Sequence, residues 1–130
     1  MRYTTYRLNG ADRVGVVAGE FLYDLAELIR MEGKESLPAH GPRPETMLDV
    51  IHLGPNFWQQ VTACLEAAEV RRASDPEGWR LYVDQGVVRS LDELERQGGR
   101  LLAPIPRPAK NLVCLGRNYR AHAEERGEEV

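Results

Sequence analysis

Prolines at alternating positions near the C-terminal end divide this 130-residue chain into two unequal parts. Each proline fixes φ near about −65° and lacks an amide donor, so neither a helix nor a central strand continues through such a run. The sequence therefore predicts a semi-rigid, extended linker over residues 103–110. We expect a folded domain over 1–102, before the linker, and the start of a second domain over 111–130. The prolines are Pro104, Pro106 and Pro108.

The length and composition are typical of a soluble globular protein. Hydrophobic residues make up 42% of the chain, charged residues make up 28%, and the net charge is −3. This small charge provides no broad basic field, so we expect neither nucleic acid nor a membrane surface as a partner. The apolar runs fall short of the roughly 20 residues that cross a bilayer, and no apolar signal segment follows Met1. We therefore expect a cytoplasmic protein.

The first residues have the alternation and turn signals of a small antiparallel meander. Residues 2–8 and 13–17 are rich in β-branched and aromatic types, and Asn9-Gly10 between them tolerates the positive φ of a tight hairpin turn. A turn at 18–20 then leads to a third short strand over 21–23. Because such a meander needs helices against one face, the fold class that we expect for the N-terminal domain is α+β, with several short helices.

Capping signals predict where the first helices begin and end. Asp24 is placed to cap a helix that Gly33 ends. Thr46, with Asp49 three residues later, resembles an N-terminal capping box. A short helix that ends near Gly54 is expected after it.

A longer helix is predicted over about 56–71, because apolar residues recur there at helical spacing. After it we expect a strand over 79–83 and a turn into Val87-Val88. Ser90, with Glu93 three residues later, predicts a last short helix that Gly98-Gly99 ends. The apolar stripe of the long helix consists of Phe57, Val61, Cys64, Leu65 and Ala68.

The residue types that often mark cysteine chemistry or metal sites have structural interpretations in this part of the chain. Cys64 and Cys114 lie among apolar neighbours, so we interpret both as core residues rather than as a disulfide or a nucleophile. Glu93-Leu94-Glu95 has the spacing of a ligand pair, but it lies on a predicted solvent-facing helix. His40 and His52 have no metal-ligand spacing. We therefore expect no metal ligands in this chain.

A motif with the residue types of an active site follows the linker. Apolar residues over 111–115 predict a short strand that ends at Gly116, and a polar turn then begins a helix. On this helix His122 and Glu125 would share a face, so the carboxylate can orient the imidazole. An imidazole with a pKa of about 6.5 can take a proton at neutral pH. Periodicity alone favours a solvated helix instead, because charged residues surround the pair.

The linker, the strand and this motif closely resemble the segment that opens the catalytic domain in the fumarylacetoacetate hydrolase family. Members carry a Pro-Ile-Pro-x-Pro linker, a hydrophobic strand and Gly-x-Asn-Tyr-x-x-His-x-x-Glu. An N-terminal segment that begins Arg-Tyr-x-x-Tyr and continues with Arg-Val-Gly-Val-Val, as here, also looks like that family. Residues 111–130 would then be the start of a β-rich catalytic domain whose remainder is absent. The matching motif residues are Gly116, Asn118, Tyr119, His122 and Glu125.

The resemblance implies a metal-dependent enzyme. It implies that Mg²⁺, or Mn²⁺ or Ca²⁺, chelates the substrate in the complete enzyme, and that His122 and Glu125 activate water. The implied reaction is C–C bond hydrolysis of an acylpyruvate or a related 2-oxo or diketo acid through a metal-bound enolate. The family also contains 2-oxo acid decarboxylases and dienoate isomerases, and the residues present do not choose among them.

The remaining motif residues have both functional and architectural interpretations. Arg117 is a candidate for binding a substrate carboxylate, although a surface arginine fits equally well. Tyr119 is a candidate substrate-binding donor that can also pack under the helix. Gly116 and Asn118 are expected to form the structural turn before the helix.

The family's metal ligands, a Glu-x-Glu pair and a later Asp, come several tens of residues after the His/Glu pair, beyond this chain. We therefore expect the chain to be the N-terminal portion of an enzyme, inactive alone, with no metal bound to it. The complete enzyme is expected to be a homodimer. Two alternatives remain: a non-catalytic binding or assembly module that keeps only the N-terminal domain, and a plain α+β domain with a fortuitous tail.

Overall fold

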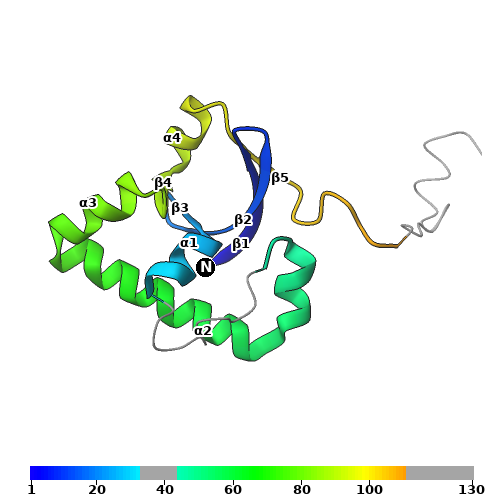
Figure 1. The fold of residues 1–130 in the computed structure, drawn as a ribbon, viewed down its shortest axis with the longest axis horizontal. Coiled ribbons are helices and arrows are strands. Elements are labelled where there is room, and N and C mark those ends of the chain that lie inside the picture. The colour runs from blue at the N-terminus through cyan, green and yellow to red at the C-terminus, as the bar shows by residue number, and fades with distance from the viewer. Residues whose placement is uncertain (33–43, 111–130) are drawn as a thin grey trace, which may run out of the picture.

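The computed structural model describes residues 1–32 and 44–110, and within these ranges the protein is an α+β domain, as predicted (Figure 1). The strands are β1 (Arg2–Leu8), β2 (Ala11–Ala18), β3 (Phe21–Asp24), β4 (Val88–Ser90) and β5 (Arg100–Leu102). The helices are α1 (Leu25–Glu32), α2 (Met47–Ser74), α3 (Pro76–Asp84) and α4 (Leu91–Arg96).

The strands form one antiparallel sheet in the order β4-β3-β2-β1-β5. The predicted hairpin between β1 and β2 is confirmed, and its two-residue turn has positive φ at Asn9 (51°) and Gly10 (79°). The third strand of the predicted meander is also confirmed, because β3 pairs with β2 from Ala18↔Phe21 to Gly15↔Asp24. The meander is therefore the central part of the sheet, and each of its outer edges gains one short strand.

Each face of the sheet has its own hydrophobic core, because successive side chains of a strand point to opposite faces. On one face, Val16 and Tyr23 pack with buried residues of α1, α2 and α3. On the other face, Tyr6 and Leu22 pack with Leu94 of α4. The predicted stripe of the long helix is confirmed as core, since all of its members are buried: Phe57, Val61, Cys64, Leu65 and Ala68.

The predicted helix caps are confirmed where the structure describes them. The carboxylate of Asp24 accepts the amide of Glu27 at 3.0 Å. Thr46 and Asp49 form a reciprocal capping box at the start of α2. The hydroxyl of Ser90 accepts the amide of Glu93 at 3.1 Å at the start of α4. The predicted helix end at Gly33 lies outside the described residues.

The two helices predicted on either side of Gly54 join into one bent helix, α2. Gly54 has non-helical angles (φ 73°, ψ −167°), and Pro55 follows it without an amide hydrogen. Because Pro55 has no amide hydrogen, it cannot donate to the carbonyl of Ile51, four residues earlier. The indole of Trp58, after the bend, donates to the carbonyl of Val50, before it, at 2.8 Å. A side chain therefore connects the two halves of the helix.

The strand predicted over 79–83 is wrong, because these residues belong to α3. Asp75 caps this helix by accepting the amide of Gly78 at 2.9 Å, and Pro76 lies in its first turn, where a missing amide hydrogen costs little. Trp79 and Tyr82, three residues apart, stack on each other with ring centroids 6.2 Å apart. The period of the apolar residues is therefore helical, although the short run also fits an alternating strand.

Strand β5 was not among the sequence predictions. It pairs with β1 from Arg7↔Arg100 to Thr5↔Leu102. Gly99, just before it, lies so close to β1 that a Cβ there would be 2.9 Å from the carbonyl oxygen of Arg7. The predicted helix stop at Gly98-Gly99 is confirmed, and the same glycines let the chain approach the sheet edge directly after α4.

Two tyrosines of β1 differ in how their hydroxyl groups are bound. The hydroxyl of Tyr6 donates to the buried carboxylate of Asp24 at 2.5 Å, and Arg13 donates to the same oxygen at 2.8 Å. The hydroxyl of Tyr3 is buried and has no hydrogen-bond partner among the described residues. Burial raises the pKa of Tyr3 to about 12.

We expect Tyr6→Phe to lower the free energy of unfolding by about 1–3 kcal/mol, because it leaves part of a buried carboxylate without its donor. Tyr3→Phe is the matched control. It removes a hydroxyl that has no partner among the described residues, so it should be neutral or slightly stabilising. Urea denaturation of both variants measures the difference. Equal losses for the two variants would contradict the Tyr6–Asp24 hydrogen bond.

The buried tyrosines also predict loss of stability at alkaline pH. Burial first, and then a neighbouring carboxylate, raises the pKa of Tyr6, Tyr23 and Tyr82. Tyrosines of the unfolded chain ionise near pH 10, whereas these three keep their protons in the folded state. Their contribution is therefore complete below about pH 10 and is lost as the pH rises towards the higher folded-state pKa values. Urea denaturation at a series of pH values from about 8 to about 11 should show this fall in the free energy of unfolding. Tyr23→Phe should make the fall shallower.

Candidate functional site

The residues that the sequence predicts as the site follow the described part of the chain. The predicted catalytic pair, His122 and Glu125, lies outside the described residues. The candidate substrate-binding residues Arg117 and Tyr119 and the turn residues Gly116 and Asn118 lie outside them as well, as does Cys114. The structure does describe the linker that leads to this segment, and the surface of the N-terminal domain beside it.

The start of the linker is held against the N-terminal domain. The hydroxyl of Thr5 on β1 donates to the carbonyl oxygen of Pro104 at 2.6 Å. The side chain of Ile105 packs against the core formed by the sheet and the helices α1 to α3. The other residues from 103 to 110 are exposed. The start of the linker is therefore attached to the N-terminal domain, a contact that the prolines alone do not predict.

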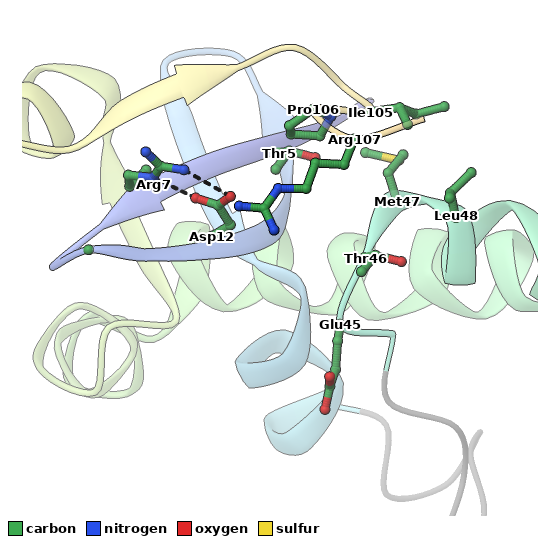
Figure 2. Close-up of a pocket in the computed structure, with 11 residues that line it drawn as sticks. Thr5, Arg7, Asp12, Glu45, Thr46, Met47, Leu48, Ile105, Pro106 and Arg107 are labelled. Atoms are coloured by element: carbon green, nitrogen blue, oxygen red, sulfur yellow. Dashed lines mark hydrogen bonds and ion pairs between the residues drawn. The ribbon is translucent and has the colours of Figure 1, made fainter. Parts of the chain in front are cut away.

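A groove lies where the linker passes the end of the β1–β2 hairpin and the first turn of α2 (Figure 2). Its volume is about 460 Å³. Met47, Leu48 and Ile105 give it an apolar side, and charged residues from the hairpin and the linker surround this side. The lining residues are Thr5, Arg7, Gly10, Asp12, Glu45, Thr46, Met47, Leu48, Ile105, Pro106 and Arg107.

The main charged feature of the groove is Asp12 on β2. Its two carboxylate oxygens accept hydrogen bonds from Arg7 at 2.6 and 3.0 Å. Figure 2 shows the guanidinium of Arg107 extending from the linker towards Asp12. The hydrogen bond from Arg7 is the largest influence that lowers the pKa of Asp12, and the charges of Arg107 and Arg100 lower this pKa further. Asp12 is therefore held as a carboxylate between arginines of the hairpin and of the linker.

Sequence reasoning missed this charged group, although the hairpin contained a signal for it. A two-residue turn at Asn9-Gly10 makes Leu8 and Ala11 cross-strand partners, and therefore also Arg7 and Asp12. Opposite charges at such positions attract each other. No comparable signal connects Thr5 with Pro104, because these residues are 99 positions apart.

A second cavity, of about 360 Å³, lies beside β2, β3 and the start of α1. Its buried carboxylate, Asp24, already accepts hydrogen bonds from Tyr6, Arg13 and the amide of Glu27. These bonds hold the sheet and cap α1. The cavity therefore contains a structural carboxylate rather than a free acid or base. It is lined by Asp12, Arg13, Val14, Asp24, Ala26, Glu27, Pro44 and Glu45.

The described residues do not fit a Mg²⁺ site. Within 1–32 and 44–110, no group of three or more His, Cys, Asp or Glu side chains is close enough to hold a metal ion. Glu93 forms an ion pair with Arg96 at 2.8 Å, and Glu95 is exposed, so this pair faces solvent as interpreted from the sequence. His52 is exposed on α2, and His40 lies outside the described residues.

Two further features concern Cys64 and the membrane. Cys64 is buried, and burial raises the pKa of its thiol, so its interpretation as a core residue is confirmed.

None of the helices in the described ranges has the length and apolar content that a membrane span requires.

The chain is similar to part of one characterised protein, the oxaloacetate tautomerase YisK of Bacillus subtilis (strain 168). The two sequences are 35% identical over 87 residues, which are 67% of this chain and 24% of the tautomerase. The match thus spans about a quarter of that relative. No protein-family model matches the chain. The similarity supports a relationship to fumarylacetoacetate hydrolase-like enzymes and, with it, an enzymatic parent family.

The groove geometry predicts how the pKa of Asp12 responds to its two arginines. Arg107→Gln should raise this pKa, and Arg7→Gln should raise it more, because Arg7 donates hydrogen bonds as well as charge. Titration of the Asp12 carboxyl carbon by NMR measures both changes. An unchanged Asp12 pKa in Arg107→Gln would place the Arg107 guanidinium away from the groove in solution.

Proposed function

We propose that this chain is the N-terminal part of an enzyme that acts on a 2-oxo or diketo acid through an enol or enolate. In this proposal, residues 1–102 are a scaffold, and the chemistry begins in the segment that follows the linker. The supporting observation is the motif from Gly116 to Glu125, which follows a Pro-Ile-Pro-x-Pro linker and a short apolar segment, in a chain that is partly similar to an oxaloacetate tautomerase.

The proposed catalytic pair is His122 and Glu125. The imidazole of His122 would act as the base at neutral pH, and the carboxylate of Glu125 would orient it and favour the imidazolium that forms. In C–C bond hydrolysis the base takes a proton from water, and the resulting hydroxide adds to the distal carbonyl carbon. The C–C bond then breaks, and its electron pair leaves as the enolate of the 2-oxo acid.

A second candidate reaction is keto–enol interconversion of a 2-oxo acid. The similar protein of Bacillus subtilis is an oxaloacetate tautomerase, which favours this reaction. Here the base takes a proton from the carbon next to the carbonyl group, the C–H electrons form a C=C bond, and the carbonyl oxygen receives a proton. This reaction shares the enolate with hydrolysis but needs neither water nor a second carbonyl group. Decarboxylation and dienoate isomerisation are further candidates from the same resemblance.

The other roles in the proposal concern substrate and metal. Arg117 is proposed to bind a substrate carboxylate, with Tyr119 as a hydrogen-bond donor beside it. Mg²⁺ is proposed as the cofactor of the complete enzyme, where it would polarise a carbonyl group. Its ligands would come from outside 1–32 and 44–110, because these ranges provide no fitting cluster. A homodimer is proposed for the complete enzyme.

The test uses the natural protein that contains these 130 residues. Purified protein is assayed with Mg²⁺ against an acylpyruvate, by loss of the diketo absorbance, and against oxaloacetate, by change of the enol absorbance. Turnover of the acylpyruvate would support hydrolysis, and turnover of oxaloacetate alone would support the tautomerase candidate. We expect His122→Asn and Glu125→Gln to lower kcat by about 10²–10⁴-fold.

Glu124→Gln is the matched control, since it removes a neighbouring carboxylate that the motif does not include. We expect this variant to keep its activity. Equal effects of Glu124→Gln and Glu125→Gln would contradict the proposed pair. A natural protein that contains the chain but turns over neither substrate would favour the alternative of a non-catalytic binding or assembly module.

A further inference from the structure

The described part of the linker changes character along its length. From 103 to 110, Ile105 is partly buried, and the other residues are exposed. The first half of this segment nevertheless returns to the face of the sheet that carries Thr5, where it closes one side of the groove (Figure 2). The second half continues away from the domain in the view of Figure 1.

We propose that residues 103–107, here called the strap, are a fixed part of the N-terminal domain, anchored by Thr5 and Ile105. The strap would set the direction in which the chain leaves the domain after Arg107. This inference concerns the described residues alone and does not depend on the proposed enzymatic function.

The first anchor is the hydrogen bond from Thr5. Thr5 pairs with Leu102, the last residue of β5, so the strap begins at the residue directly after the partner of Thr5. Pro104 has no amide hydrogen, so the strap cannot extend the hydrogen-bond ladder of β5 in the usual way. Thr5 is 5% exposed, and its hydroxyl donates to the Pro104 carbonyl oxygen at 2.6 Å. A side chain thus continues the attachment where the ladder ends.

The second anchor is the packing of Ile105. Its side chain contacts the core that also contains Met47 of α2 and Val14 of β2. Burial of an aliphatic side chain is favourable, and release of the strap would return Ile105 to water. The prolines on either side of Ile105 lower the conformational entropy of the free linker, so ordering it costs less than ordering an ordinary loop.

A charge attraction extends the attachment to the end of the strap. The guanidinium of Arg107 extends towards the carboxylate of Asp12, and its charge contributes to the lowered pKa of Asp12. Both residues are exposed, so this attraction is weak and screened by salt. Thr5 and Ile105 are therefore the anchors, and Arg107 adds a small contribution.

The experiment measures ¹⁵N relaxation of the 130-residue chain and compares order parameters at the amides of Ile105, Arg107 and Lys110. In the native chain we expect S² of about 0.85 at Ile105 and Arg107, as in rigid backbone, and below about 0.6 at Lys110. Thr5→Val keeps the shape of the side chain but removes the donor. We expect it to lower S² at Ile105 and Arg107 while the amides of β2 stay rigid.

Thr4→Val is the matched control. Thr4 is the neighbouring residue of the same strand, is 9% exposed and points to the other face, where its hydroxyl donates to the carbonyl oxygen of Thr5 at 3.2 Å. We expect Thr4→Val to leave the strap rigid. Ile105→Ala tests the second anchor without any change in the sheet, and it decides the question if Thr5→Val fails to fold.

Low order parameters at Ile105 and Arg107 in the native chain would overturn the proposal. An unchanged strap in a folded Thr5→Val variant would overturn it too, as would equal loosening by Thr4→Val and Thr5→Val. Where only Ile105→Ala can be measured, an unchanged S² at Arg107 overturns the proposal, and a lowered value supports it.

Discussion

The pairing of β5 with β1 determines how the two ends of the described chain relate to each other. β5 follows α4, the last helix of the described residues, and its residues come more than 90 positions after their partners in β1. The pairing brings the first residues of the chain and the start of the linker to the same sheet edge. The groove, the Thr5–Pro104 hydrogen bond and the placement of Ile105 all depend on it.

The hydrogen-bonded carboxylate of Asp24 has a comparable importance inside the sheet. It ends β3, caps α1 and binds Tyr6 and Arg13 from two other strands. A buried carboxylate is costly unless donors surround it, and here three different segments provide them. The same group therefore fixes the helix start and the hairpin relative to each other.

Local signals in the sequence predicted much of this fold, because caps and tight turns involve residues only a few positions apart. The hairpin at Asn9-Gly10, the caps at Thr46 and Ser90, and the buried stripe of α2 are confirmed. The strand predicted over 79–83 was wrong, since a five-residue segment rich in apolar residues is ambiguous and the Asp75 cap decides for a helix. Strand β5 was missed because its partner is distant in sequence.

In the candidate site, too, the contacts between residues close in sequence were predictable and the contacts between distant residues were not. The charge pair Arg7–Asp12 follows from the hairpin register, whereas the groove that it borders requires the linker to return to β1. No spacing rule predicts such a return. The motif residues His122 and Glu125 remain predictions from sequence, supported by a partial similarity to an oxaloacetate tautomerase.

The bend of α2 at Gly54 allows one helix to serve two surfaces. The turn before the bend provides Met47 and Leu48 to the groove, and the turns after it provide Phe57, Val61 and Leu65 to the core. The Trp58 indole, after the bend, donates to the carbonyl of Val50, before it, and so connects the two halves. Met47 and Val50 of the first half also belong to the core, whereas Leu48 lines the groove without belonging to it, so substitutions at Leu48 can reshape the groove wall while the packing against the sheet is kept.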